Sequence, residues 1–199
     1  TCPIMASTLV AEFPEVAEAT RFASPFNANQ LSVKFEEIVL LQDGVFAVDS
    51  NFFDFFSYKL IAGDAKTALK EPNTVVMTEA AAKKFFGDSP AVGKLITVGN
   101  DNETYTVTGV MEAPPSNSHL KFNMLVSAST MRYLKNPAWL NNNLYTYVVL
   151  HPNVSIDKVI ARFPALIEKY IGPEIEEFMG VTLKQMQENG GAYGYGATK

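Results

Sequence analysis

The stretch Gly87–Lys94 has the sequence GDSPAVGK and carries the glycines and the lysine of a phosphate-binding loop. Its spacing does not fit, because one residue too many separates the two glycines. Leu95 also stands where that loop needs a hydroxyl group for magnesium, and a predicted helix precedes the stretch instead of a strand. The glycines of Gly191–Gly196 lack the spacing of a dinucleotide site and have no strand before them. The sequence therefore predicts no nucleotide cofactor.

The candidate metal ligands are few and lie far apart in the sequence. His119 and His151 are the only histidines, and Cys2 is the only cysteine. A zinc site would need both histidines together with Cys2 or with carboxylates from distant segments. None of the closely spaced ligand pairs typical of zinc sites is present. We expect both histidines to be solvated and the purified protein to hold no stoichiometric transition metal.

Nucleophilic and acid–base catalysis also lack their residues. Ser89 precedes a predicted strand and does not lie on the strand-to-helix turn that exposes a nucleophilic serine. Glu36 and Glu37 fall on opposite faces of a predicted strand, and Glu176 and Glu177 lie in a solvated run, so neither pair can act together on one substrate. We therefore predict no catalytic, cofactor-binding or metal-binding residue. Generic esters, peptides and phosphates should not be hydrolysed.

The segment Phe52–Tyr58 has the most unusual composition in the chain, because five of its seven residues are aromatic. One face of a short helix cannot cover all five rings, so some of them must meet a second element or a partner. Aromatic side chains serve cores and interfaces equally well. Two interpretations stay open: core packing between two subdomains, which we favour, and an external interface.

The composition is that of a folded globular protein, with 47% apolar residues in a chain of 199. The formal net charge of -5 does not attract a phosphate backbone, so we expect no nucleic-acid partner. The single cysteine excludes an internal disulfide. No apolar run reaches the roughly 18 residues that span a bilayer. Because Thr1 is not an initiator methionine, we expect the chain to be part of a longer protein.

The central part of the chain predicts a β-α-β-β-β unit. A strand over 74–77 leads into a helix over 78–86, which Thr78 can cap and after which Gly87 can supply a positive φ. Three further strands follow before Ser127, because β-branched runs alternate there with clusters of glycine, proline and asparagine.

The flanking parts predict helices and strands of ordinary length. A short helix should end near Phe13 because of Pro14, and Asp43-Gly44 predicts a hairpin between the strands 38–41 and 45–48. Pro164 should kink a helix that Ser155 caps. The other expected elements are a strand after Glu15, a loop over 24–29, a strand over 31–35, a helix over 52–58, a helical turn over 129–134, a strand over 144–150, and weaker helices over 174–179 and 183–188.

Three blocks of sequence occur in a recognisable order. They are DSNFFDFFSYKLIAGD at 49–64, NTVVMTEAAAKKFFGDSPAVGKLI at 73–96 and YTVTGVMEAPPSNSHLKFNMLVS at 105–127. Together they resemble the MacB-type periplasmic core domain of ABC-transporter permeases in the FtsX-like family. The similarity covers most of the chain, and it is greater to permeases of Bacteroidetes-like Gram-negative bacteria than to the macrolide exporter.

The resemblance implies an α+β fold with two subdomains. Residues 1–34 and 143–199 would form a porter-like β-α-β subdomain, and residues 35–142 would form an inserted mixed α/β subdomain. The strand over 144–150 and the helix after it have few local partners, which also indicates that they pack against the beginning of the chain. Both termini would then lie in the same subdomain.

The resemblance also implies a function without chemistry of its own. Such a domain lies on the periplasmic side of the bacterial inner membrane, between the first two transmembrane helices of a permease. It would couple cytoplasmic ATP hydrolysis to movement that acts on a periplasmic substrate or partner. The implied partners are a second permease subunit in a dimer, a cytoplasmic ATPase subunit or domain, and a periplasmic adaptor or lipoprotein.

Two other classes of function compete with this interpretation. A secreted or periplasmic ligand-binding module would need a deep apolar pocket with convergent polar groups. A hydrolase is disfavoured, because the nucleophile and the base are missing. Without membrane helices to raise its effective concentration, the chain alone should be monomeric or only weakly self-associating.

Overall fold

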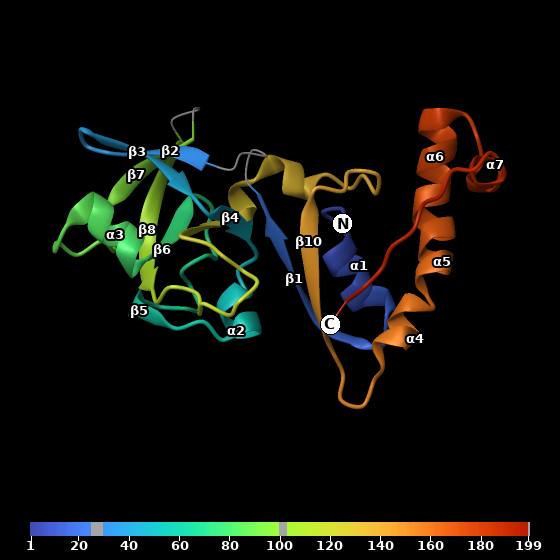
Figure 1. The fold of residues 1–199 in the computed structure, drawn as a ribbon, viewed down its shortest axis with the longest axis horizontal. Helices are drawn as coiled ribbons and strands as arrows, with labels where there is room; N and C mark the ends of the chain where they lie inside the picture. The colour runs from blue at the N-terminus through green and yellow to red at the C-terminus, as the bar shows by residue number, and fades with distance from the viewer. Residues whose placement is uncertain (25–29, 100–102, 199) are drawn as a thin grey trace. The chain divides into compact units, whose positions relative to one another are not determined.

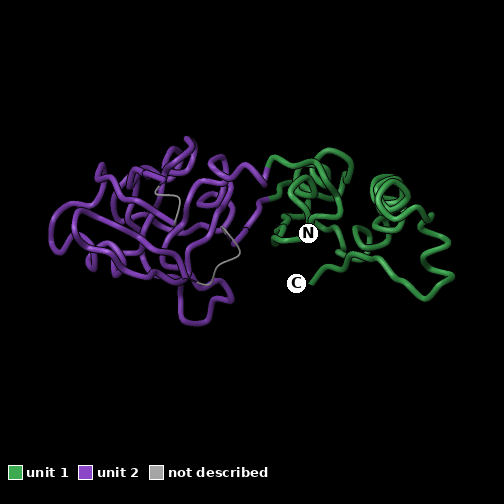
Figure 2. The backbone as a smooth tube through the Cα atoms, turned by 90° about the horizontal axis from the view of Figure 1, so that it is seen from above, with its two compact units in different colours: residues 1–19, 135–199 green, residues 20–134 purple. Residues whose placement is uncertain are grey.

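The computed structural model describes residues 1–24, 30–99 and 103–198 of the chain (Figure 1). The fold is α+β, as predicted, and the chain forms two compact units (Figure 2). Unit 1 contains residues 1–19 and 135–199, and therefore both termini. Unit 2 contains residues 20–134. The loop predicted over 24–29 falls, except for Ser24, outside the described residues.

The strands join in a mixed ten-stranded sheet. They are β1 (Val16–Ala23), β2 (Gln30–Phe35), β3 (Ile38–Asp43), β4 (Val45–Val48), β5 (Leu60–Gly63), β6 (Thr74–Thr78), β7 (Leu95–Val98), β8 (Glu103–Met111), β9 (Met124–Ser127) and β10 (Leu144–Leu150). Their order is β10-β1-β4-β9-β6-β8-β7-β2-β3, with β5 attached to β8. β4 runs parallel to β9 and β6 runs parallel to β8, whereas β2 is antiparallel to both of its neighbours.

The predicted β-α-β-β-β unit is confirmed in unit 2. β6 leads into α3 (Glu79–Phe86), and the Thr78 hydroxyl oxygen accepts a hydrogen bond of 3.2 Å from the Ala81 amide at the start of that helix. α3 buries Ala81 and Phe85 on the face that the sequence pattern predicts. Gly87, with a φ of 61°, ends the helix. Because each signal is local in the sequence, this unit could be recognised without knowledge of the sheet.

The predicted hairpin around Asp43-Gly44 is wrong. β3 pairs with β2 through a turn at Glu36-Glu37, whereas β4 pairs with β1 and β9. Gly44 does have the positive φ that the hairpin signal requires, 62°, but there it lets the chain pass from the edge of the sheet to its interior. The backbones are close at this point, since a Cβ atom on Gly44 would lie 3.0 Å from the Asn123 nitrogen. Glu36 and Glu37 therefore form a turn and not opposite faces of a strand.

Unit 1 contains several short helices, and prolines stand near the boundaries of some of them. They are α1 (Met5–Glu12), α4 (Ile156–Ile160), α5 (Phe163–Leu166), the π-helical η4 (Ile167–Ile171), α6 (Gly172–Met179) and α7 (Leu183–Glu188). α1 ends just before Pro14, as predicted. The helix that was predicted to kink is interrupted instead. In a continuous α-helix the ring of Pro164 would clash with the Ile160 carbonyl group, and α4 ends at Ile160. The helices expected over 174–179 and 183–188 are present in α6 and α7.

The core of unit 1 combines both ends of the chain. Its buried members are Cys2, Met5, Leu9, Phe13, Val16, Trp139, Val159, Phe163, Leu166, Ile167, Ile171 and Ile175. Trp139 stacks on Tyr170 with ring centroids 4.6 Å apart. The glycine-rich end of the chain lies against this core, where Tyr193 and Tyr195 are partly buried. The tail therefore uses its tyrosines, and not helical or strand hydrogen bonds, to pack against the unit.

Candidate functional site

The candidate metal ligands do not come together. His119 is exposed and lies in unit 2, whereas the exposed His151 and the buried Cys2 lie in unit 1. Over residues 1–24, 30–99 and 103–198, no three His, Cys, Asp or Glu side chains are placed to hold a metal ion. The described residues therefore contain no site with the geometry of a zinc centre.

The stretch Gly87–Lys94 returns the chain from α3 to the sheet. The Ser89 amide donates to the Phe86 carbonyl oxygen at 3.1 Å, and the Gly93 amide donates to the Val107 carbonyl oxygen at 2.7 Å. A phosphate-binding loop instead runs from a strand into a helix and directs its amides at the ligand. The order of elements expected from the sequence, with the helix first, is confirmed.

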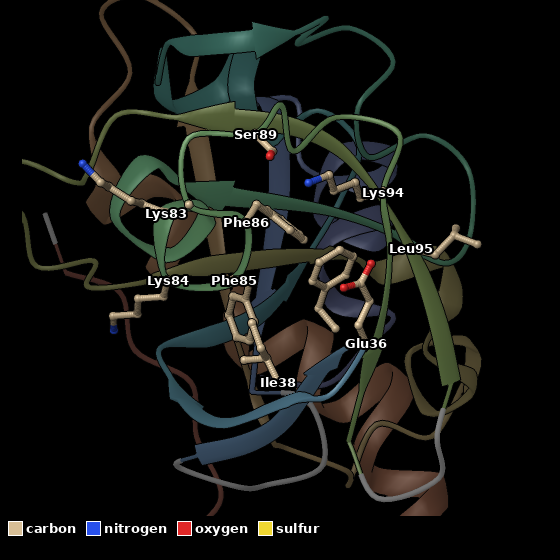
Figure 3. Close-up of a pocket in the computed structure, with 11 residues that line it drawn as sticks. Glu36, Ile38, Lys83, Lys84, Phe85, Phe86, Ser89, Lys94 and Leu95 are labelled. Carbon is tan, nitrogen blue, oxygen red and sulfur yellow. The ribbon is translucent and has the colours of Figure 1, made fainter.

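An open groove of about 780 Å³ lies in unit 2 between the β2–β3 turn and the C-terminal end of α3 (Figure 3). Its lining residues are Phe35, Glu36, Ile38, Lys83, Lys84, Phe85, Phe86, Gly87, Ser89, Lys94 and Leu95. The lining combines three phenylalanine rings with the charged side chains of Glu36, Lys83, Lys84 and Lys94. Sequence analysis missed this groove, because it depends on a pairing of β2 with β7 that no local signal indicates.

The groove has the features of a binding surface. Phe35 and Phe86 meet edge to face with centroids 4.7 Å apart. The Lys94 ammonium group lies 4.7 Å from the centre of the Phe86 ring and 5.2 Å from that of Phe35, a cation–π arrangement. Ser89 has no histidine among the lining residues to act as its base. The groove can therefore accept a ligand in which an apolar side chain lies beside a charged group.

The strand β3 borders the groove and exposes four consecutive apolar residues. The exposed fractions are 40% for Ile38, 56% for Val39, 37% for Leu40 and 70% for Leu41. β3 stands at the end of the sheet order and pairs with β2 alone among the described strands. Its apolar sequence is typical of a buried strand. The exposure of β3 follows only from its position at the edge of the sheet.

The aromatic segment Phe52–Tyr58 belongs to the core of unit 2. Phe52 is fully buried and packs against Phe22 and Phe122, with ring centroids 6.3 and 5.7 Å apart. Phe53 is also buried, and it meets Phe52 edge to face. All of these rings lie in unit 2. Phe52 and Phe53 are therefore core residues of unit 2 itself, whereas the sequence analysis favoured core packing between two subdomains.

Arg21 lies where the chain enters and leaves unit 2. Its guanidinium group donates to the Asp49 carboxylate at 2.6 and 3.0 Å and to the Leu134 carbonyl oxygen at 2.9 Å. The Tyr133 hydroxyl group donates to the Ser24 carbonyl oxygen at 3.2 Å, and burial raises the pKa of Tyr133 to about 12. These contacts tie the first and the last residues of unit 2 together. No sequence signal indicates them, because the partners are far apart in the chain.

Comparison with protein families identifies the chain. The profile of the MacB-like periplasmic core domain matches residues 4–166. The chain belongs to this family. As a MacB-like periplasmic core domain, it is a periplasmic or extracellular domain of a MacB-type ABC transporter permease. The matched family is a transporter family and not a catalytic one.

Solved structures of the same fold agree with this membership. A domain of a putative permease from Porphyromonas gingivalis is 26% identical, with a TM-score of 0.70 over 83% of this chain and 69% of that one. The periplasmic region of MacB from Actinobacillus actinomycetemcomitans is 15% identical, with a TM-score of 0.57 over 95% and 82%. The extracellular domain of the noncanonic ABC-type transporter YknZ from Gram-positive bacteria is 15% identical, with a TM-score of 0.54 over 89% and 83%.

Two further observations concern this MacB-like domain. A comparison with curated proteins finds no match. Among the described residues, no helix has the length and apolar character needed to cross a bilayer. The family membership favours the transporter domain over the secreted ligand-binding module that the sequence left open.

Proposed function

We propose that this domain is a mechanical part of its permease. In this proposal, cytoplasmic ATP hydrolysis moves membrane helices joined to unit 1, and the movement reaches a substrate or partner outside the membrane through unit 2. Unit 1 acts as the porter-like subdomain and unit 2 as the inserted one. β2 then belongs to the inserted part, although the sequence boundary at residue 34 divides it, because β2 pairs with β3 and β7.

The observation that carries the proposal is the junction around Arg21. The chain passes between the two units twice, at residues 19–20 and 134–135. On the side of unit 2, Arg21 bonds both to Asp49 and to the Leu134 carbonyl oxygen. A charge-assisted, bidentate pair of this kind resists separation better than a single neutral hydrogen bond. Both connections to unit 2 are therefore anchored in one place, which suits a part that is moved as a whole.

The proposal assigns partners by their place in the transporter. A second copy of the permease forms the dimer in the membrane, and the ATPase subunit or domain lies in the cytoplasm. A periplasmic adaptor or lipoprotein receives the movement. None of these partners needs a reactive side chain on this domain, which fits a surface whose groove lacks a catalytic pair.

The test follows both units in the full transporter. Spin labels are attached at Lys158→Cys on α4 of unit 1 and, separately, at Lys83→Cys on α3 of unit 2, two exposed positions. Distances between the copies in the reconstituted dimer are measured without nucleotide and in a trapped ATP state. The expected result is an ATP-dependent change at both positions. Unchanged distance distributions at both positions would overturn the proposal.

The Arg21 junction is tested by a matched pair of substitutions. Arg21→Gln removes the contact to Asp49 and Leu134, whereas Arg162→Gln removes a pair with Glu15 inside unit 1. Both variants lose one positive charge. We expect Arg21→Gln to broaden or abolish the ATP-dependent change at position 83 while position 158 still responds. We expect Arg162→Gln to leave the change at position 83 intact, and equal effects of the two variants would contradict the role of the junction.

A further inference from the structure

We propose that the outer edge of β3 is a docking edge, which accepts an extended strand with an apolar centre and basic ends from a partner protein. The proposal concerns the four exposed residues Ile38–Leu41 and the acidic residues on either side of them. It deepens the proposed function, since it names the surface and the chemistry of a partner on the same side of the membrane. Its test, however, does not require the transporter.

The backbone of β3 is available for pairing. Its residues are in register with β2 from Phe35↔Ile38 to Gln30↔Asp43, without a shift. In an antiparallel pair, the N–H and C=O groups of alternate residues point away from the partner strand. Because β3 stands last in the sheet order, these groups face no other described strand. A row of such groups is the template that strand addition uses.

The edge also lacks the features that protect ordinary edge strands. Natural edges carry lysine, proline, a bulge or a covering segment that discourages pairing. Ile38–Leu41 contains none of these residues, its register with β2 is regular, and both faces of the strand are exposed. Leu41, at 70% exposure, is one of the most exposed large apolar residues described. An unprotected apolar edge of this kind marks an interaction site.

The acidic residues at the ends of β3 favour a partner strand with basic ends over a second copy of this chain. Glu36 and Glu37 precede the apolar run, and Asp43 follows it. If two copies paired antiparallel, Glu37 of each would approach Asp43 of the other; if they paired parallel, identical acids would meet. Like charges opposite one another destabilise a strand pair in either case. A partner strand with lysine or arginine at both ends instead places opposite charges at both ends of the edge.

Basic side chains close to the turn do not cancel this pattern. Lys34 belongs to β2, opposite Val39, one strand away from the free edge. Lys94 rests on the rings of Phe35 and Phe86. Figure 3 shows the ammonium groups of Lys83 and Lys84 extending away from Glu36. The acids therefore leave negative charge at both ends of β3: Glu36 and Glu37 in the turn before it, and Asp43 at its end, where the carboxylate accepts hydrogen bonds from the Gln42 and Asn123 side chains.

The groove adjoins the docking edge at one residue. Ile38 is both the first residue of β3 and part of the groove lining. Phe35, which pairs with Ile38, belongs to β2 and therefore lies on the side of β3 away from the free edge. The docking edge is accordingly formed by β3 itself, and the groove is a separate neighbouring surface.

The experiment measures peptide binding to the whole chain by fluorescence anisotropy at low salt. The probe is a labelled peptide whose centre alternates valine and threonine and whose ends carry two lysines each. The control peptide has glutamates at its ends, and a second control has a central proline that removes a ladder donor. We expect the lysine-ended peptide to bind about tenfold more tightly than the glutamate-ended one, because opposite charges replace like charges at both ends. Equal binding, or none, would overturn the proposal.

Two substitutions locate the binding on β3. Leu41→Lys places a charge on the edge, and Ile61→Lys places the same charge on β5, where Ile61 is 52% exposed. We expect about tenfold weaker binding for Leu41→Lys and unchanged binding for Ile61→Lys, because only the first replaces apolar contact by like-charge repulsion. If Leu41→Lys fails to fold by circular dichroism, Glu37→Lys, in the exposed turn, tests the same edge. Equal effects at positions 41 and 61 would contradict the site.

Hydrogen exchange identifies the pairing itself. Added lysine-ended peptide should slow exchange at alternate amides of β3, as a new strand neighbour would. Protection that appears with protein concentration alone, without peptide, would instead identify a second copy as the occupant and overturn the proposal. Because no transporter is present, failure here leaves the test of ATP-driven movement untouched, and failure of that test leaves peptide binding standing.

Discussion

Gly63 and Gly93 have similar backbone conformations, with φ values of 93° and 90°, but only Gly63 is crowded. A Cβ atom on Gly63 would lie 2.3 Å from the Thr108 carbonyl oxygen, whereas nothing lies within 4 Å of one on Gly93. We expect Gly93→Ala to lower the free energy of unfolding by about 1–2 kcal/mol, because alanine disfavours a positive φ. Gly63→Ala should lower the free energy of unfolding by about 2–4 kcal/mol, because the backbone of β8 must also move to make room for the methyl group. Urea unfolding measures both, and equal costs would contradict the structure.

Glu12 connects the beginning of the chain to its later helices. Hydrogen bonds from Lys169 and from the Tyr170 hydroxyl group lower the pKa of the Glu12 carboxyl group from its ordinary value. The folded state thus favours the charged form, so this stabilisation is present above the unfolded-state pKa and disappears as the pH falls through the folded-state pKa. The free energy of unfolding of Glu12→Gln should therefore fall less between pH 7 and pH 3 than that of the wild type.

The control for this pH series is Glu177→Gln, an exposed residue of α6. It removes the same charge at a position where the structure shows no hydrogen bond to the carboxylate. Its unfolding profile should follow that of the wild type. A Glu12→Gln profile parallel to the wild type would show that the contact to Lys169 does not stabilise the folded state.

At the scale of elements, the aromatic helix α2 (Phe52–Phe56) makes the sharpest prediction. Phe53 is 3% exposed, so Phe53→Ala should cost about 3–5 kcal/mol through lost burial and the cavity left behind. Phe55 and Phe56 are only partly buried, so we do not expect a loss of stability of this size at either position. Phe55→Ala is the matched control. Thermal unfolding compares the variants. A smaller loss of stability for Phe53→Ala than for Phe55→Ala would contradict the observed burial of Phe53.

Elements with local signals could be predicted from the sequence, and pairings between distant strands could not. Thr78 and Gly87 mark the ends of α3 by their own chemistry, and Pro164 interrupts its helix in the same way. The dipeptide Asp43-Gly44 gave the wrong hairpin, because a positive φ suits a crossing between strands as well as a tight turn. The edge position of β3 depends on the whole sheet order and has no local signal.

For the candidate surfaces, too, local residue types could be interpreted from the sequence, whereas contacts between distant strands could not. The absence of a catalytic, cofactor-binding or metal-binding residue was an expectation from residue types, and it stays a prediction. The groove and the Arg21 junction were not predicted. Phe35 meets Phe86, and Arg21 meets Leu134, only after several strands have paired. Contacts of such long separation cannot be read from spacing in one sequence.

At the scale of the whole molecule, resemblance predicted more than periodicity. The three ordered blocks led to the family that the comparison confirms over residues 4–166. They also led to two subdomains with both termini in one of them, which stays a proposal about how the transporter is divided. Physical patterns alone predicted an α+β chain without naming its function, because a fold by itself does not imply a function.

The last prediction concerns the state of association of the chain. Without the membrane helices, two copies lose the high effective concentration that a shared membrane provides, so the chain should be monomeric or weakly associating at micromolar concentration. The acids Glu37 and Asp43 oppose edge-to-edge pairing of β3 at low salt. Because salt screens exposed charges over about 10 Å at 0.1 M, any association should increase with salt and should be reduced by Leu41→Lys. Sedimentation velocity over a concentration series measures this, and a tight dimer at low salt would contradict both the monomer and the charge argument.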